Sequence, residues 1–225
     1  MWFRFKYKFV LQHSDAVALY RHRWYGHLVV VKESSASEAR MLMHLENCDG
    51  VQQLFESYRE HQRVRLVLAF YDSFDAHERI QHDALLTCSA GAVNELILNI
   101  ARCLQQCHQA HIAHLNLTFE HVMFHRTIQC YLISVGSSQV CPHDQLYQGC
   151  VTGTAVAPEF AQGQFGLRSD VYCLGTMYKM ICHKPYDTFI DHMMDANYYR
   201  RPTIDECIIH FEHQDSLLTS LTHAS

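Results

Sequence analysis

The chain has 225 residues and a mass of 26.2 kDa, which suffices for one large domain or a tight two-lobed unit and excludes several independent domains. Hydrophobic residues make up 48% and aromatic residues 12%, so the composition predicts a packed core and argues against intrinsic disorder. The net charge of −5 predicts no polyanion-binding surface, so we expect no nucleic-acid partner. Full protonation of the 18 histidines would move this charge to about +13.

The sequence predicts neither export nor membrane insertion. Residues 1–10 alternate aromatic with basic side chains and lack the continuous apolar segment of a signal peptide. No run approaches the roughly 18 apolar residues that cross a bilayer. We therefore expect an intracellular protein, not a secreted one, with ten reduced cysteines. Cys103 and Cys107 have a spacing at which two thiolates on a helix can share a metal.

The first third of the chain predicts mainly strands. The period of a half-buried strand is seen at the start, where basic residues alternate with Phe3, Phe5, Tyr7 and Phe9. Further strands are expected at 17–20 and 28–31, then a helix over 34–45 and a hairpin of 54–58 with 64–70.

The remainder changes to a helical period. A helix is expected over 92–109, because one face of it would carry Val93, Leu96, Ile97, Ile100 and Leu104. After it we expect short strands at 122–124 and 131–133, a loop, and helices near 169–182 and 203–211. A small β-rich part followed by a larger helical part predicts an α+β arrangement.

Seven short motifs, in a fixed order across residues 9–212, resemble those of the protein kinase domain. The first two are Val29-Val30-Val31-Lys32, similar to V-A-I-K, and Glu38 with Leu42 and Leu45, similar to helix C. H-R-D-L-K-P-E-N is matched by His114-Leu115-Asn116-Leu117-Thr118-Phe119-Glu120-His121, and D-F-G by Ser134-Val135-Gly136. The last three are Gly153–Glu159, similar to the end of an activation segment, Ser169–Gly175, similar to the start of the large-lobe anchor helix, and Arg201-Pro202-Thr203.

The resemblance implies an α+β, protein-kinase-like bilobal fold. Residues 1–70 would form a small β-rich N-lobe with a five-stranded sheet and a short helix C, and residues 71–225 a mainly helical C-lobe. Only 31 residues separate Asp170 from Arg201. This spacing is about half that usual in the family, so the C-lobe is expected to be shortened.

The resemblance also implies a pseudokinase, because the polar catalytic positions have changed. Asn116 stands where the family has its catalytic Asp, His121 and Ser134 where it has magnesium ligands, and Thr118 where it has a lysine. A neutral amide cannot act as a base, imidazole is a poor ligand for a hard cation, and a hydroxyl carries no charge. We therefore expect no catalytic residue, no metal and no cofactor.

The nucleotide site is altered as well. The glycine positions of the phosphate loop fall at Val10, Gln12 and Asp15, whose side chains keep the backbone from closing over phosphates. Val30 stands in place of the small alanine beneath the adenine. We expect nucleotide binding to be absent or weak.

The motif residues that remain are architectural according to the resemblance. Lys32 and Glu38 form a vestigial nucleotide-site pair, and six extended residues reach about 20 Å, so the two side chains can meet. Asp170 is expected to bind the catalytic-loop backbone, and Glu159 to pair with Arg201. Four side chains are expected to stack between the lobes, namely Leu42, Leu54, His114 and Val135.

We expect a catalytically inactive binding module that regulates or inhibits another kinase or a signalling protein, with no membrane partner. The small lobe, through 34–45 and 3–9, is expected to contribute to the partner site, although 3–9 has the alternative of covering its own core. The changes are similar to those of viral kinase relatives, such as herpesvirus serine/threonine kinases and baculovirus kinase mimics, which implies the host cytoplasm or nucleus. Two alternatives stay open: a residual or atypical ATP-dependent serine/threonine kinase that uses Lys32, and a pH-responsive or metal-binding structural protein that uses its histidines.

Overall fold

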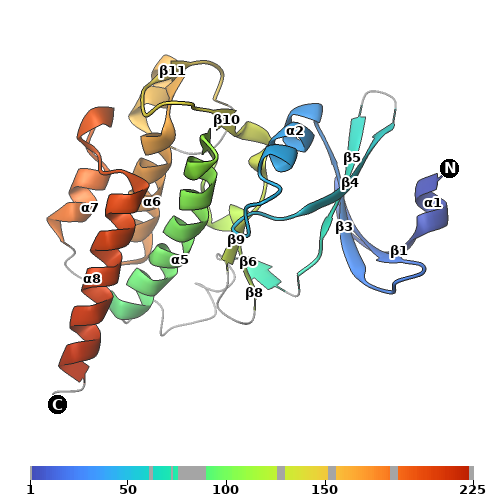
Figure 1. Ribbon diagram of the computed structural model, residues 1–225, viewed down its shortest axis with the longest axis horizontal. Coiled ribbons are helices and arrows are strands. Elements are labelled where there is room, and N and C mark those ends of the chain that lie inside the picture. Colours follow the sequence, from blue (N-terminus) through green and yellow to red (C-terminus); the bar gives the residue numbers. More distant parts are fainter. Residues whose placement is uncertain are drawn as a thin grey trace.

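The computed structural model describes residues 2–60, 63–71, 73–75, 90–125, 130–151, 156–182 and 187–222. Two lobes lie along the longest axis, with the largest β-sheet at one end and the long helices at the other (Figure 1). The N-terminus lies at the outer end of the small lobe, and the C-terminus lies beyond the helices of the large lobe. The predicted α+β arrangement is confirmed.

The small lobe is built on a five-stranded antiparallel sheet with the order β1-β2-β3-β5-β4. Its strands are β1 (Tyr7–Ser14), β2 (Val17–His22), β3 (Leu28–Ser34), β4 (Leu54–Glu60) and β5 (Arg63–Ala69). The central pairing is that of β3 with β5, in which Val30 lies opposite Leu68 and Lys32 opposite Leu66. This register places Lys32 in the middle of the sheet, next to the large lobe.

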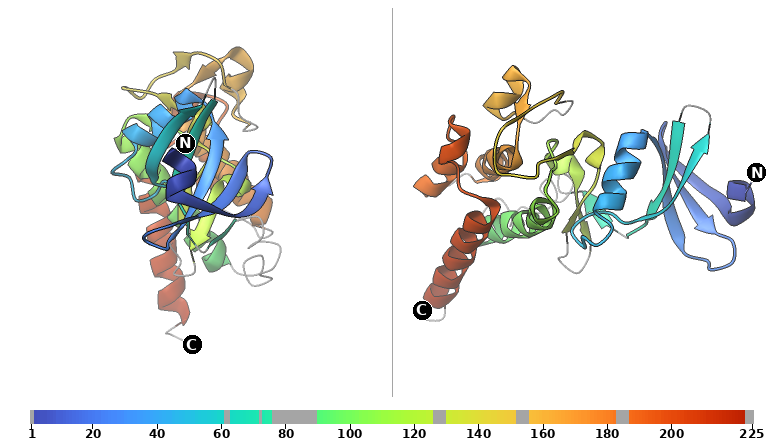
Figure 2. Two further views of the ribbon diagram at one scale, coloured as in Figure 1. Left: turned by 90° about the vertical axis from the view of Figure 1, so that its right-hand side faces the viewer. Right: turned by 45° about the horizontal axis from the view of Figure 1, so that its top comes forward.

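Each face of this sheet is covered by a different helix. Helix α2 (Ala36–His44) covers the face toward the large lobe, where Leu42 and Leu66 belong to the main core. Helix α1 (Trp2–Lys6) covers the opposite face, where Phe3 and Tyr7 pack in one cluster with Val29, Val31 and Val67. The two views of Figure 2 show α1 as the outermost element of the small lobe.

The prediction of a strand over residues 3–9 is wrong in its first half. Phe3 and Tyr7 are buried, four residues apart, and Phe5 between them is 66% exposed, as helical periodicity requires. Phe3 makes ring contacts with Tyr7, Tyr20 and Tyr58 at 5.1–5.6 Å between centroids. Residues 2–6 form a helix and not a strand because the outer face of the sheet is apolar and a helix can cover it.

The large lobe consists of four helices and small sheets among the described residues. The helices are α5 (Ala90–Gln109), α6 (Leu167–Ile181), α7 (Thr188–Met193) and α8 (Ile204–Thr222). A three-stranded sheet consists of β6 (Ser73–Asp75), β8 (Val122–His125) and β9 (Cys130–Leu132). Two-stranded pairs are formed by β7 (Ile112–Ala113) with β10 (Gln139–Val140), and by β11 (Tyr147–Gln148) with β12 (Gln164–Phe165).

Within the described chain, no helix has the length and hydropathy that a bilayer crossing requires.

We predict that Phe3→Ala lowers the free energy of unfolding by about 3 kcal/mol, because it removes a buried ring from the cluster under α1. Phe5→Ala on the same helix is the matched control, and its effect should stay within about 0.5 kcal/mol because Phe5 is exposed. Urea denaturation followed by circular dichroism measures both values. Equal losses in the two variants would contradict the helix, because a strand would place Phe3 and Phe5 on one face.

Candidate functional site

The candidate site lies where β3, α2 and the segment after β9 meet. Lys32 Nζ donates to Glu38 Oε1 at 2.8 Å and lies 3.5 Å from Ser134 Oγ. Glu38 is only 4% exposed, and its second carboxylate oxygen accepts a hydrogen bond from the Ser34 hydroxyl. The retained lysine and glutamate therefore meet, and both are engaged by neighbouring serines.

A very short connection brings Glu38 so close to Lys32. Strand β3 ends at Ser34 and helix α2 begins at Ala36, so only one residue lies between them. That residue, Ser35, caps the helix, and its hydroxyl oxygen accepts the Glu38 N–H at 3.2 Å. The cap places Glu38 in the first turn of α2, where a carboxylate interacts favourably with the helix dipole.

Asp170 anchors the loop over residues 114–121 through hydrogen bonds to its backbone. The fully buried carboxylate of Asp170 accepts the backbone N–H groups of His114 and Leu115, each at 2.8 Å. His108 Nε2 lies 2.9 Å from the same carboxylate. Asp170 thus links α5, α6 and the loop, and Leu115 is held at a φ of +59°.

The polar residues of this loop bond to the loop itself. His121 Nδ1 donates to the Asn116 carbonyl oxygen at 2.8 Å and lies 3.2 Å from Thr118 Oγ1. One imidazole therefore closes the turn that contains the two other changed positions.

Of the four residues predicted to stack between the lobes, three are buried and Leu54 is partly exposed. Leu42 and Val135 belong to the main core, and Leu54 packs against it. His114 is fully buried, and its Nε2 donates to the Ile133 carbonyl oxygen at 3.1 Å. Helix α2 contacts the turn Val135–Ser137 directly, so the core continues from one lobe into the other.

Glu159 and Arg201 form a buried, two-pronged ion pair. Arg201 donates through Nη1 and Nη2 to the two carboxylate oxygens of Glu159, each at 2.7 Å. Ser169 Oγ adds a third hydrogen bond at 2.6 Å. Burial raises the pKa of Glu159, but these hydrogen bonds outweigh it and hold the pKa below its ordinary value. Removing one partner from such a pair costs about 3–5 kcal/mol.

The hairpin of β1 and β2 occupies the place expected for a phosphate loop. Ser14 pairs with Val17 across a two-residue turn, and the Gln12 amide bonds to carbonyl oxygens of both these residues. Val10 and Gln12 are exposed on this strand, and Asp15 is exposed in the turn. The predicted motif Gly153–Glu159 is described only from residue 156, because Gly153, Thr154 and Ala155 lie outside the described residues.

Several residues of the site carry no signal in the sequence. Ser34 bonds to Glu38, and the aromatic rings of Tyr172 and Tyr198 lie 4.8 and 5.7 Å from the Arg201 guanidinium. Serine and tyrosine are too common for a single sequence to single them out. The kinase motifs identify Glu159 and Arg201 in the sequence, whereas the residues around this pair are identified only in the folded structure.

The cysteine spacing that suggested a metal has a packing role here. Cys103 Sγ lies 3.2 Å from Cys130 Sγ, and burial raises the pKa of the Cys107 thiol. In the described ranges, no three His, Cys, Asp or Glu side chains are grouped as a metal site requires.

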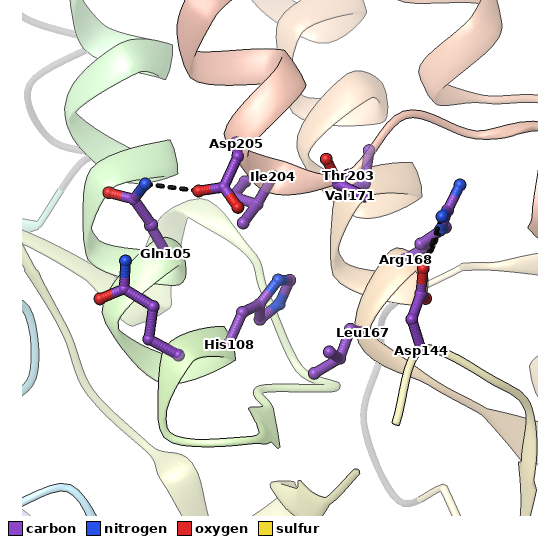
Figure 3. A pocket seen from close by; sticks show the side chains of 10 residues that line it. Gln105, His108, Asp144, Leu167, Arg168, Val171, Thr203, Ile204 and Asp205 are labelled. Atoms are coloured by element: carbon purple, nitrogen blue, oxygen red, sulfur yellow. Dashed lines mark hydrogen bonds and ion pairs between the residues drawn. The ribbon is translucent and has the colours of Figure 1, made fainter. Parts of the chain in front are cut away.

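A pocket of about 220 Å³ lies between α5, the start of α6 and the start of α8 (Figure 3). His108 points toward it from α5, while Asp205 accepts a hydrogen bond from Gln105 at 2.5 Å at its rim. Arg168 and Asp144 close the opposite side as an ion pair. The polar groups at both rims are therefore largely bonded to each other.

A comparison with known families adds to this geometry. The sequence model of the protein kinase domain matches residues 16–200, which is most of the chain. No curated protein matches. The match runs from the β1–β2 hairpin to the residue before Arg201, so it includes Lys32, the loop over 114–121 and Asp170. The predicted bilobal, kinase-like fold with a shortened large lobe is confirmed.

We predict that acidification below about pH 6.5 destabilises the protein through two buried histidines. His22 Nδ1 accepts the N–H groups of Trp24 and Tyr25 at 3.3 and 3.2 Å, and His114 Nδ1 accepts that of Asn116 at 3.4 Å. Burial lowers the pKa of both histidines from the ordinary 6.5. The unfolded chain then binds more protons than the folded chain, so stability is present above pH 6.5 and is lost as the pH falls toward the lowered values.

The measurement is urea denaturation at pH 7.5 and pH 5.5. His22→Asn keeps an acceptor oxygen near Nδ1 without a titrating group, so it should reduce the difference between the two pH values. His13→Asn, at an exposed position, is the control and should leave it unchanged. An equal free energy of unfolding at both pH values would contradict the prediction.

Proposed function

The chain belongs to the protein kinase domain family, and we propose that it is a catalytically inactive member that binds another kinase or a signalling protein and shifts its conformational equilibrium. The shortened large lobe and the changed motif residues also support a viral origin, and with it action inside the host cell. Partner binding, inactivity and origin are parts of this one proposal.

The chemistry at the changed positions supports inactivity. Phosphoryl transfer needs a residue that orients the acceptor hydroxyl and acidic or amide ligands that hold magnesium over the phosphates. Asn116, His121 and Ser134 offer an amide, an imidazole and a hydroxyl, so none supplies a negative charge. His121 already closes the loop at 2.8 Å from Asn116 O, and Ser134 lies beside Lys32. At the positions of the family's catalytic groups, these side chains form contacts within the protein itself.

The single observation that carries the proposal is the ion pair of Lys32 with Glu38 at 2.8 Å. It ties β3 to α2, and α2 in turn contacts Val135–Ser137 of the large lobe. A binding surface made by both lobes needs such a tie, because a preorganised surface spends less binding free energy on ordering. The retained pair therefore has a use that does not depend on nucleotide.

The outer side of α2 is the part of this surface that a partner can reach. Arg40 and Met43 are exposed on α2, with Met43 at 52%, while Leu42 beside them is buried. Methionine adapts its shape to different apolar surfaces, which suits it to protein contacts. We place the partner site on this side of the helix.

The proposal is tested by affinity purification from the cells that make the protein, followed by mass spectrometry. A protein kinase or a signalling protein should co-purify with the wild-type chain and be lost with Met43→Glu. The matched control is Ile209→Glu on α8, because Ile209 is 66% exposed and lies in the other lobe. Loss with the control variant but not with Met43→Glu would place the site elsewhere and contradict this assignment.

The rival function, a residual ATP-dependent serine/threonine kinase, is favoured by the retention of Lys32 and is tested by catalysis. We predict that the protein incorporates no radiolabelled phosphate into itself or generic substrates above the level of a Lys32→Ala variant. Restoring the family residues with Asn116→Asp, His121→Asn and Ser134→Asp together should also fail, because Gln12 and Asp15 still occupy the phosphate loop. Activity above the Lys32→Ala level in either protein would overturn the proposal of inactivity.

We also predict that ATP with magnesium does not raise the melting temperature of the wild-type chain. Val30 is partly buried on the cleft face of β3, between Leu19 and Leu68 of the adjacent strands, and packs against the main core. Val30→Ala should lower the free energy of unfolding by roughly 1–3 kcal/mol through the cavity it leaves. A magnesium-dependent rise in melting temperature with ATP would count against the blocked nucleotide site.

A further inference from the structure

The chain's charge is divided unequally along its length. Residues 1–28 contain five Lys or Arg residues and one Asp, which gives +4. Since the whole chain carries −5, the remaining residues carry −9. Although the chain is acidic as a whole, residues 1–28 at the outer end of the small lobe are therefore basic.

Exposed aromatic rings lie in this same region. Phe5 is 66%, Trp24 58% and Tyr25 79% exposed, and the Phe5 and Trp24 rings touch at 5.3 Å between centroids. None of the three is needed by the cluster under α1, which is formed by Phe3 and Tyr7. We call these three rings together with the basic side chains of α1 and the turn the basic–aromatic end; the basic members are Arg4, Arg21 and Arg23.

The cations of the basic–aromatic end are not neutralised within the described part of the chain. Lys6 is paired with Glu56. By contrast, Arg4 and Arg23 are exposed and form no ion pair with a described carboxylate. Arg21 Nη1 donates to the Gly26 carbonyl oxygen at 2.8 Å, which fixes the side chain without cancelling its charge.

The turn that carries the aromatic rings is rigidly held. The neutral His22 ring accepts the N–H groups of both Trp24 and Tyr25. The Arg23 N–H donates to the Lys6 carbonyl oxygen at 2.9 Å, which joins the turn to α1. The exposed rings are thus presented on a braced support, so little conformational entropy is lost when they bind.

We infer that the basic–aromatic end docks on an anionic phospholipid surface. Aromatic rings that project beside several cations are the pattern by which proteins bind the interface of a membrane, the rings entering the headgroup layer and the cations attracting anionic lipids. Helix α1, which carries Arg4 and Phe5, lies at the extremity of the longest axis (Figures 1 and 2), on the side away from the large lobe.

An added peptide strand fits this end less well. The edge strand β1 contains two irregularities in its pairing, between Phe9 and Leu11 and between Gln12 and Ser14. Bulges of this kind bend an edge strand and oppose the regular addition of another strand. The inference goes beyond the proposed function, and it replaces the expectation from the sequence that the chain has no membrane partner.

The test is co-sedimentation of the full chain with large vesicles at 0.1 M salt. One set contains phosphatidylcholine alone, and the other contains phosphatidylcholine with 30 mol% phosphatidylserine. We expect binding to the anionic vesicles at least tenfold stronger than to the neutral ones, and release at 0.5 M salt. No binding to the anionic vesicles, or equal binding to both sets, would overturn the inference.

Two variants locate the contact. Arg21→Gln combined with Arg23→Gln should lower binding about 25-fold, since each cation near such a surface contributes about fivefold. The matched control, Arg200→Gln with Ile209→Ala in the large lobe, should bind like the wild type, and circular dichroism verifies both folds. In a Trp2→Phe background, the fluorescence of Trp24 should shift to shorter wavelength on anionic vesicles. An unshifted spectrum, or tighter binding to a soluble polyglutamate than to the vesicles, would contradict docking on lipid.

Discussion

The buried carboxylate of Asp170 is the group on which the arrangement of the large lobe depends. Its negative charge is removed from water, and such burial is costly unless donors surround it. Two backbone N–H groups of the loop and the His108 ring supply them. Because the donors come from α5 and from the loop while Asp170 belongs to α6, none of the three can move alone. The left-handed backbone at Leu115 is held in place by the same contacts.

The two lobes share one apolar core, so their relative orientation is a matter of packing as well as of charge. Leu66 of the sheet, Leu42 of α2, Val135 of the following turn and Leu104 of α5 all belong to it. The Lys32–Glu38 pair lies at the edge of this core and fixes α2 against the sheet. In the protein kinase family these elements also frame the nucleotide. In this chain they enclose a core that continues from one lobe into the other.

Motifs with fixed spacing made the large lobe and the buried bridges predictable, because Asp170, Glu159 and Arg201 each have one chemical role in the family. The start of the chain was not predictable from its alternation. Phe3 and Tyr7 satisfy a period of two and also the four-residue spacing of a helix, and only the apolar outer face of β3 and β5 decides between them. Ser34 shows a second limit, since its contact with Glu38 follows from where β3 ends. The basic–aromatic end shows a third limit of prediction from the sequence, because the net charge of the chain does not say where the charged residues lie.

The single residue between β3 and α2 has a mechanical consequence. A helix on a longer connection can swing outward and return, and a kinase lobe with such a helix has at least two states. Here Ser35 is both the whole connection and the helix cap, so any rotation of α2 breaks the hydrogen bond to the Glu38 N–H and pulls on β3 itself. The short connection thus couples α2 to the sheet, so that the helix and β3 move together and not independently.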